Sequence, residues 1–352
     1  MIWFLLVLAL AQPAAANVET GTINGAPFRI EMPATWNKGL IMYAHGYQPA
    51  DTKPDLDNAR NPPFRQIFLS RGFAYAESAY SAQSWAVKEG LEDTEALRRY
   101  FVTKHGRPAE SYIVGHSMGG HITIATIERY PEAYDGAMPM CGPLGPALDF
   151  FDNGLFDMLV TFEALFPDTI GDVTERHPGV AARIKAAVAT DAARAERYAA
   201  RWGRSVADLP VALPLFNLIA SEIKTRAGGQ PYDNQNRVYS GFGDDAAVNR
   251  TVKRYTGDPG AREYLRQYFT PTGRTSDPVL ALHAMADPLV LGEDVAIYAT
   301  LAAIAGNSDK FVLRFSGEAG HCSFTMEQTA NAFDALRAWA RDGKKPAAGE
   351  QK

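Results

Sequence analysis

Residues 111–131 read SYIVGHSMGGHITIATIERYP, and this stretch decides the fold. An apolar run before Ser117 predicts a buried strand, and the residues after it have the composition of a helix. Ser117 stands between Gly115 and Gly119, in the pattern G-x-S-x-G. This pattern is typical of a sharp strand-to-helix turn that exposes a serine hydroxyl, because the glycines let strand and helix pack closely. The stretch therefore predicts a nucleophilic serine at position 117.

Strands and helices alternate on both sides of this turn. Alternation over residues 40–141 predicts an α/β fold with a mostly parallel, doubly wound sheet. The alternation stops in residues 142–272, which are helical or irregular and rich in alanine. We therefore predict a sheet domain over 17–141 and 273–343, with residues 142–272 inserted as a helical cap. Residues 344–352 are expected to be a flexible tail.

Two short patterns give local predictions within the sheet domain. Asn24-Gly25 separates two short extended runs, which is a strong hairpin signal. Thr325 stands three residues before Gln328, in the spacing of a capping box, so the last helix is expected to begin there.

The first residues have the layout of a secretory signal peptide. An apolar run from Ile2 to Leu10 precedes small residues at 14–16, and cleavage is expected after Ala16. The run is too short to span a bilayer, and we expect no later segment with the length and apolarity of a membrane span. The mature protein is thus predicted to be secreted or periplasmic, without stable membrane insertion. The alternative is a buried N-terminal strand.

The net charge of the chain limits the classes of partner that it is expected to bind. The 352 residues contain 35 Lys and Arg against 40 Asp and Glu, a net charge of −5 with no basic block, which argues against a nucleic-acid partner.

Cys141 and Cys322 are the two cysteines. In an oxidising compartment two cysteines usually pair, so a disulfide is predicted. Two independent buried thiols are the alternative.

A serine hydroxyl becomes a good nucleophile only when a base removes its proton and an acid orients that base. Among seven histidines, His321 in GEAGHCSF lies after the last predicted strand and is the predicted base. Asp287 in LHAMADPLV follows an apolar strand and is the predicted acid. Asp294 is the competing acid, and Asp149 or Asp152 from the cap are weaker candidates.

The reaction also needs backbone N–H donors for a developing oxyanion. The N–H of Met118, directly after the serine, is one candidate. The other is the N–H of Tyr47, with Gln48 as the alternative. Four neighbouring residues are expected to line the substrate site: His45, Gly46, His116 and His121.

Together these residues resemble those of serine hydrolases of the α/β-hydrolase superfamily, with esterase-like and lipase-like members. The motifs are HGY at 45, GHSMGG at 115, DPLV at 287 and GHC at 320, and the resemblance covers residues 20–341 apart from the cap. It implies an α/β-hydrolase fold. It also implies that a small-molecule or polymeric carboxylic ester is cleaved through an acyl-enzyme, with no metal or organic cofactor.

The dipeptide His321-Cys322 is similar to the tannase and feruloyl esterase group. In that group the cysteine after the histidine is bonded to a cysteine directly before the serine. Here His116 precedes the serine, so that arrangement is absent and Cys141 is the available partner.

Other activities use the same residues. An exopeptidase or amidase with the same triad is the main alternative. Such enzymes usually carry a large N-terminal domain or acidic residues that hold a free amine, whereas only a predicted hairpin precedes the first long strand. Acyl transfer to an alcohol and cyanohydrin cleavage are further options. A non-catalytic binding module of this fold is expected to lack the nucleophile, the acid or the base, and all three have candidates.

Overall fold

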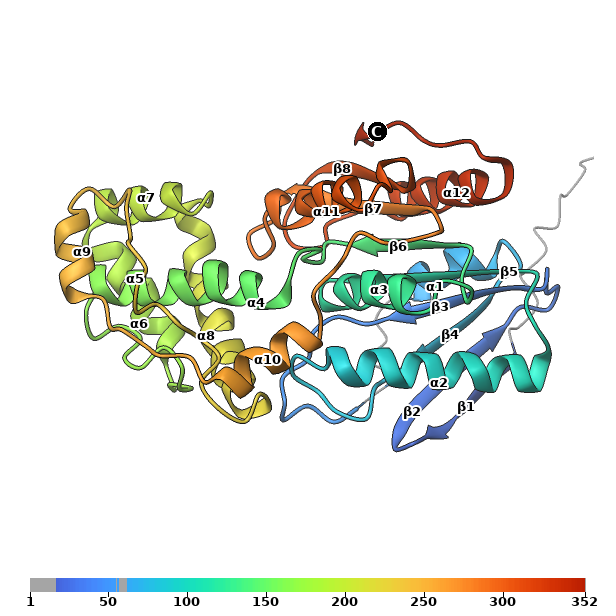
Figure 1. Ribbon diagram of the computed structural model, residues 1–352, viewed down its shortest axis with the longest axis horizontal. Helices are drawn as coiled ribbons and strands as arrows, with labels where there is room; N and C mark the ends of the chain where they lie inside the picture. Colours follow the sequence, from blue (N-terminus) through green and yellow to red (C-terminus); the bar gives the residue numbers. More distant parts are fainter. Residues whose placement is uncertain (1–16, 55, 57–61, 352) are drawn as a thin grey trace, which may run out of the picture.

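A computed structural model describes residues 17–54, 56 and 62–351, so the predicted signal peptide at 1–16 lies outside the described residues. The described strands form a single mixed sheet of nine strands, in the order β1-β2-β4-β3-β5-β6-β7-β8-β9 (Figure 1). Their bounds are β1 (Asn17–Ile23), β2 (Ala26–Met32), β3 (Gly39–Ala44), β4 (Ala74–Ser78), β5 (Glu110–His116), β6 (Gly136–Met140), β7 (Val279–Ala286), β8 (Phe311–Ala319) and β9 (Gly349–Glu350).

The sheet is parallel from β4 through β9, and only β1 and β2 introduce antiparallel pairs. The predicted hairpin is present, because Asn24 and Gly25 turn β1 into β2 with positive φ angles of 51° and 85°. The central strands are apolar because both of their faces are covered, as is usual for parallel sheets. The predicted fold class, a mostly parallel sheet wound on both faces, is confirmed.

Five helices cover the two faces of the sheet. They are α1 (Pro62–Leu69), α2 (Val87–His105), α3 (Met118–Arg129), α11 (Gly292–Ile304) and α12 (Met326–Asp342), and a short 3-10 turn, η3 (Ser308–Lys310), precedes β8. Helices α2, α3 and α11 bury their apolar sides against one face, and α1 and α12 against the other. Thr325 and Gln328 form the predicted capping box at the start of α12.

Between β6 and β7 the structure has helices and no strand. They are α4 (Ala147–Asp149), η1 (Phe150–Phe156), α5 (Asp157–Leu165), α6 (Val180–Thr190), α7 (Ala192–Arg201), η2 (Val206–Asp208), α8 (Leu209–Arg226), α9 (Asp245–Thr251) and α10 (Pro259–Gln267). Figure 1 shows most of these helices gathered beyond one end of the sheet, at the left of the view. Their apolar residues, including Phe156, Phe162 and Tyr198, form a core of their own that also reaches α2 and α3. We keep the name cap for residues 142–272.

Two sequence expectations are corrected here. The tail expected at 344–352 is not wholly irregular, because β9 pairs with β8 and Gln351 donates from Nε2 to the carbonyl of Gln328, 2.5 Å away. One segment after the predicted signal peptide, Val206–Arg226, does have the length and hydropathy of a membrane span, with a mean hydropathy of 1.5. Its helix α8 is apolar because it lies at the centre of the cap, where Leu213, Phe216 and Ala220 are buried.

Candidate active site

Ser117 lies at a sharp turn between β5 and α3. Its φ of 55° and ψ of −124° are unfavourable for a residue with a side chain, and such strain persists where the surrounding structure imposes it. The flanking glycines explain the sequence pattern. A Cβ on Gly119 would lie 2.0 Å from the carbonyl oxygen of Ala44, and one on Gly115 would lie 2.3 Å from that of Gly119. Only glycine fits at either position.

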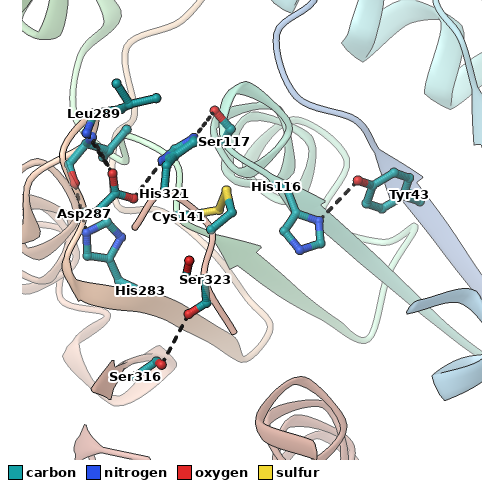
Figure 2. The surroundings of a disulfide bond; sticks show 12 residues. Tyr43, His116, Ser117, Cys141, His283, Asp287, Leu289, Ser316, His321 and Ser323 are labelled. Carbon is teal, nitrogen blue, oxygen red and sulfur yellow. Dashed lines mark hydrogen bonds and ion pairs between the residues drawn. A yellow bond between two sulfur atoms is a disulfide. The ribbon is translucent and has the colours of Figure 1, made fainter. Parts of the chain in front are cut away.

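Three side chains that are distant in the sequence meet at this turn, as Figure 2 shows. His321 Nε2 lies 2.9 Å from Ser117 Oγ, and His321 Nδ1 lies 2.7 Å from Asp287 Oδ2. Asp287 directly follows β7, and His321 follows β8. Because neighbouring parallel strands end at the same edge of the sheet, their loops bring these groups together.

The hydrogen-bond partners indicate which ring nitrogen of His321 carries a hydrogen and how Asp287 is oriented. An ionised carboxylate only accepts, so Nδ1–H of His321 donates to Asp287 and leaves Nε2 free to accept from the serine hydroxyl. The side chain of Asp287 is fully buried, and its Oδ1 accepts from the backbone N–H of Leu289 at 2.8 Å and of Val290 at 3.1 Å. The acid is therefore held in one orientation.

The competing acids have other partners. Asp294 Oδ2 accepts from the backbone N–H of Leu291, 2.8 Å away at the start of α11, and burial raises the pKa of Asp294 to about 6. Asp152 forms an ion pair with Arg262 at 3.0 Å inside the cap. Asp149 lies in the short helix α4. The carboxylate that His321 contacts is that of Asp287.

The chain after β3 passes beside the serine. A Cβ on Gly46 would lie 3.2 Å from Ser117 Cβ, so the backbone of this loop passes close to Ser117. The next residue, Tyr47, donates its phenol hydrogen to Glu222 Oε2 on the cap helix α8, 2.7 Å away. Met118 is the first residue of α3. The oxyanion role of the Met118 and Tyr47 N–H groups stays a prediction.

A cavity of about 490 Å³ opens next to Ser117 and His321. Three of the four residues expected at the substrate site line this cavity: His45, Gly46 and His116. His116 Nδ1 lies 3.2 Å from the hydroxyl of Tyr43 (Figure 2), and the ring of His45 stacks on Tyr80 at a centroid distance of 3.8 Å. Burial lowers the pKa of His45 and of His116 to about 4, so both are neutral at pH 7.

His121 is the exception, and the expectation that it lines the substrate site is corrected. The residue is fully buried one helical turn after the serine, and its Nδ1 lies 2.8 Å from the carbonyl of Pro143. Its ring packs against Trp85 and Phe269 rather than against the cavity. At this helical position the side chain lies against the loop after β6, so its role here is packing.

The predicted disulfide is present between Cys141 and Cys322, with the two Cα atoms 5.2 Å apart. Cys141 directly follows β6, and Cys322 directly follows His321 (Figure 2). The disulfide links residues that are 181 positions apart. It links the loop after β8, which carries His321, to the end of β6, and β7 lies between these two strands in the sheet.

Sequence reasoning missed several residues around this site. Five residues from β3, α1 and β4 also line the cavity: Tyr43, Phe64, Arg65, Tyr75 and Glu77. Glu77 could have been singled out from the sequence, because it is a carboxylate inside the apolar run FAYAESAY. Arg204 of the cap contacts the loop that carries Asp287, and no local pattern pointed to that contact.

Comparisons with known proteins show which solved structures share the fold of this chain. No family model and no curated protein matches this sequence. Among solved structures, lipase A from Candida antarctica matches with a TM-score of 0.50 and 15% identity, over 92% of this chain and 75% of that chain. A puromycin-hydrolysing peptidase from Mycobacterium tuberculosis matches at 0.49 and 16%, over 98% and 43%. Est1E from Butyrivibrio proteoclasticus matches at 0.43 and 12%, over 92% and 98%. At such identities a likeness shows the fold alone.

Proposed function

We propose that this chain, whose fold is that of the α/β-hydrolases, is a serine hydrolase that cleaves carboxylic esters through an acyl-enzyme. The observation that carries the proposal is the continuous hydrogen-bonded chain from Asp287 through His321 to Ser117. It supplies a nucleophile, a base and an orienting acid in one place, which is the arrangement that acyl transfer to serine requires.

Acylation begins when Ser117 Oγ attacks the ester carbonyl carbon and its proton passes to His321 Nε2. Asp287 stabilises the imidazolium that forms. The N–H groups of Met118 and Tyr47 are proposed to bind the negatively charged oxygen of the tetrahedral intermediate. The bond between the carbonyl carbon and the alkoxy oxygen then breaks, and His321 gives its proton to the departing alcohol.

Deacylation repeats these steps with water. His321 takes a proton from a water molecule, whose oxygen attacks the acyl carbon. When the tetrahedral intermediate collapses, the carboxylic acid leaves and the proton returns to Ser117 Oγ. None of these steps requires a redox change.

An exopeptidase or amidase remains the alternative, because the same three residues can cleave an amide. One observation favours it: the cavity has a buried carboxyl group, Glu77, which is the type of group that holds a substrate amine.

The experiment is to treat the purified protein with a fluorophosphonate and to locate the adduct by mass spectrometry. We expect one label, on Ser117, and none in Ser117→Ala. Ser70→Ala changes an exposed serine at the end of α1 and is the control that keeps full labelling. A label elsewhere in the wild-type protein contradicts the proposal.

Relative rates then separate ester from amide cleavage. We expect nitrophenyl esters to be turned over faster than aminoacyl anilides by the wild-type protein, and Ser117→Ala to lose both activities. Faster turnover of the anilides would move the protein to the exopeptidase class.

We also propose that the protein is secreted or periplasmic. The disulfide supports this proposal because such bonds persist mainly in oxidising compartments. N-terminal sequencing of the exported protein is expected to begin at Asn17. Recovery of the protein only inside the cytoplasm with its first residues intact contradicts it.

A further inference from the structure

A carboxyl group with an unsatisfied oxygen lines the catalytic cavity. Glu77 is 3% exposed, and it shares the cavity wall with Ser117 and His321. Its Oε2 accepts from the hydroxyl of Tyr75 at 3.2 Å, whereas its Oε1 has no hydrogen-bond partner. Buried polar atoms in folded proteins are nearly always paired, so an exception at a reaction centre points to a ligand.

The position of Glu77 follows from strand register. Glu77 lies opposite Tyr43 of β3 and opposite Arg29 of β2, so the three residues form one row across the sheet. Side chains alternate along a strand, and this row faces the same side as the buried Tyr75. Glu77 is thus fixed in the cavity wall by the sheet itself.

The neighbouring arginines do not account for this carboxylate. Arg65 Nε lies 2.8 Å from Glu31 Oε1, and Arg29 Nε lies 2.5 Å from the same oxygen. Glu31 therefore serves as an anionic partner for both guanidinium groups. Burial makes ionisation of Glu77 costly and raises its pKa to about 7. A carboxyl group that is costly to bury, and that keeps one oxygen unpaired although Arg65 and Arg29 lie near it, is better explained by binding of a ligand.

A second acceptor lies in the same cavity. Gln48, in the loop after β3, lines the cavity, and its Oε1 is buried without a hydrogen-bond partner. Part of the cavity wall is aromatic, because Tyr43, Phe64 and Tyr75 line it and contact one another. The cavity thus combines flat apolar surfaces with acceptor oxygens.

On the basis of the proposed function, we propose that Glu77 forms a subsite for a neutral, hydroxyl-bearing part of the ester substrate. A hydroxyl supplies the donor that Oε1 lacks, and its carbon frame packs on the aromatic wall. An ammonium group is disfavoured. The positive charges of Arg65 and Arg29 act on Glu77, so an ammonium group placed beside it would be repelled by them.

The test uses esters that differ in a single substituent, and the substituents compared have similar sizes. On the acyl side these are methyl 4-(hydroxymethyl)benzoate, methyl 4-ethylbenzoate and methyl 4-(aminomethyl)benzoate. On the alcohol side they are 4-(hydroxymethyl)phenyl acetate and 4-ethylphenyl acetate. We expect the hydroxymethyl ester of at least one series to have a kcat/KM about 10-fold to 100-fold above its ethyl counterpart, the range of one buried hydrogen bond.

Two variants test whether Glu77 causes the preference. Glu77→Leu removes both oxygens at similar size, and we expect the ratio of hydroxymethyl to ethyl kcat/KM to fall close to 1 while the ethyl ester is still cleaved. Glu77→Gln keeps one acceptor oxygen, and an intermediate ratio is expected. This milder change preserves the test if the leucine variant does not fold.

Glu95→Gln is the matched control. Glu95 is 4% exposed and is paired with Arg98 and Arg99 on α2, so the control removes the charge of another buried carboxylate that has arginines nearby. It does not line the catalytic cavity. We expect its hydroxymethyl preference to equal that of the wild-type protein.

The remaining outcomes overturn one proposal or the other. Equal kcat/KM for hydroxymethyl and ethyl esters in both series, or a preference unchanged in Glu77→Leu, refutes the subsite and leaves the esterase function intact. A preference for the aminomethyl ester refutes the neutral hydroxyl and favours an amine-binding site. Failure to cleave any ester, together with no fluorophosphonate label on Ser117, refutes the proposed function itself.

Discussion

Arg204 of the cap donates from Nε to the carbonyl oxygen of Pro288, 2.8 Å away and one residue after Asp287. A second bond runs from its Nη2 to the carbonyl of Leu289 at 3.3 Å. Asp287 itself accepts from the N–H of Leu289, so the guanidinium and the carboxylate both form hydrogen bonds with the same short loop. The position of the acid therefore depends on a residue that lies more than 80 positions earlier in the chain.

We predict that Arg204→Ala lowers kcat by about 10-fold to 100-fold, because a small displacement of a catalytic group has effects of this size. KM is expected to change little. Arg201→Ala is the control, since Arg201 is exposed on α7 and donates only to the carbonyl of Ser240 among the described residues. The measurement is steady-state kinetics with a nitrophenyl ester, alongside the melting temperature. An unchanged kcat in a folded Arg204→Ala variant contradicts the positioning role.

The cap also holds the loop that follows β3. Glu222 accepts from the hydroxyl of Tyr47 at 2.7 Å and from the N–H of Ala50 at 3.0 Å. Glu222→Ala is predicted to lower kcat by about 10-fold, less than the 100-fold or more that complete loss of an oxyanion donor costs.

A double-mutant cycle with Tyr47→Phe checks this relationship. Both changes remove the same phenol–carboxylate bond, so the double variant is expected to lose less than the product of the two single losses. Tyr47→Phe leaves the bond between the Ala50 N–H and Glu222 intact, and its effect is therefore expected to be the smaller one. Strictly multiplicative losses would show that the two side chains act independently.

Glu77 gives a prediction about stability and pH. Its pKa rises from 4.5 to about 7 in the folded protein, mainly through burial, which outweighs the opposing influence of Arg65, Tyr75 and Arg29, while Glu31 raises it slightly. Between these two pH values the folded state binds more protons than the unfolded state. The contribution of Glu77 to the free energy of unfolding therefore falls as pH rises, by up to about 3 kcal/mol.

Glu77→Gln removes this titration. Compared with the wild-type protein, the variant is expected to gain stability as the pH is raised from about 4.5 to about 7, and its advantage should then level off. Urea unfolding of both proteins across this range is the measurement. A constant difference in unfolding free energy across the range would show that Glu77 keeps its ordinary pKa.

The disulfide contributes to both stability and geometry. Because Cys141 and Cys322 close a loop of 181 residues, Cys141→Ser/Cys322→Ser is predicted to lose about 4 to 5 kcal/mol of unfolding free energy. Cys322 is the neighbour of His321, so kcat is expected to fall as well. Guanidinium unfolding and kinetics, with dithiothreitol-treated wild-type protein as a parallel sample, test both effects. Stability that is unaffected by the double change would contradict the prediction.

The parts of the fold that were predictable from sequence are those set by local chemistry. The turn at Ser117 needs glycines on both sides, the hairpin needs Asn24 and Gly25, and the last helix needs the Thr325 side chain at its start. Asp287 and His321 were found because parallel strands deliver their following loops to one edge. The structure brings these residues together, and their catalytic roles stay predictions.

The parts that were missed depend on contacts between distant segments. The two-residue strand β9 is held by backbone hydrogen bonds, so it leaves no side-chain pattern. The direction of His121 depends on which side of α3 the loop after β6 occupies. Arg204 lies in the loop between α7 and η2, and Glu222 lies in α8, where the spacing of apolar residues indicates only the core of the cap. Their partners become visible only when the cap and the sheet are seen together.

The cap contacts two separate loops of the candidate active site. Arg204 binds the loop after β7, and Glu222 binds the loop after β3. Exchanging residues 142–272 for the corresponding segment of another enzyme would therefore alter turnover as well as selectivity. Chimeras built on this chain should retain both side chains, so that the substrate specificity changes while the two loops beside Ser117 and Asp287 keep their positions.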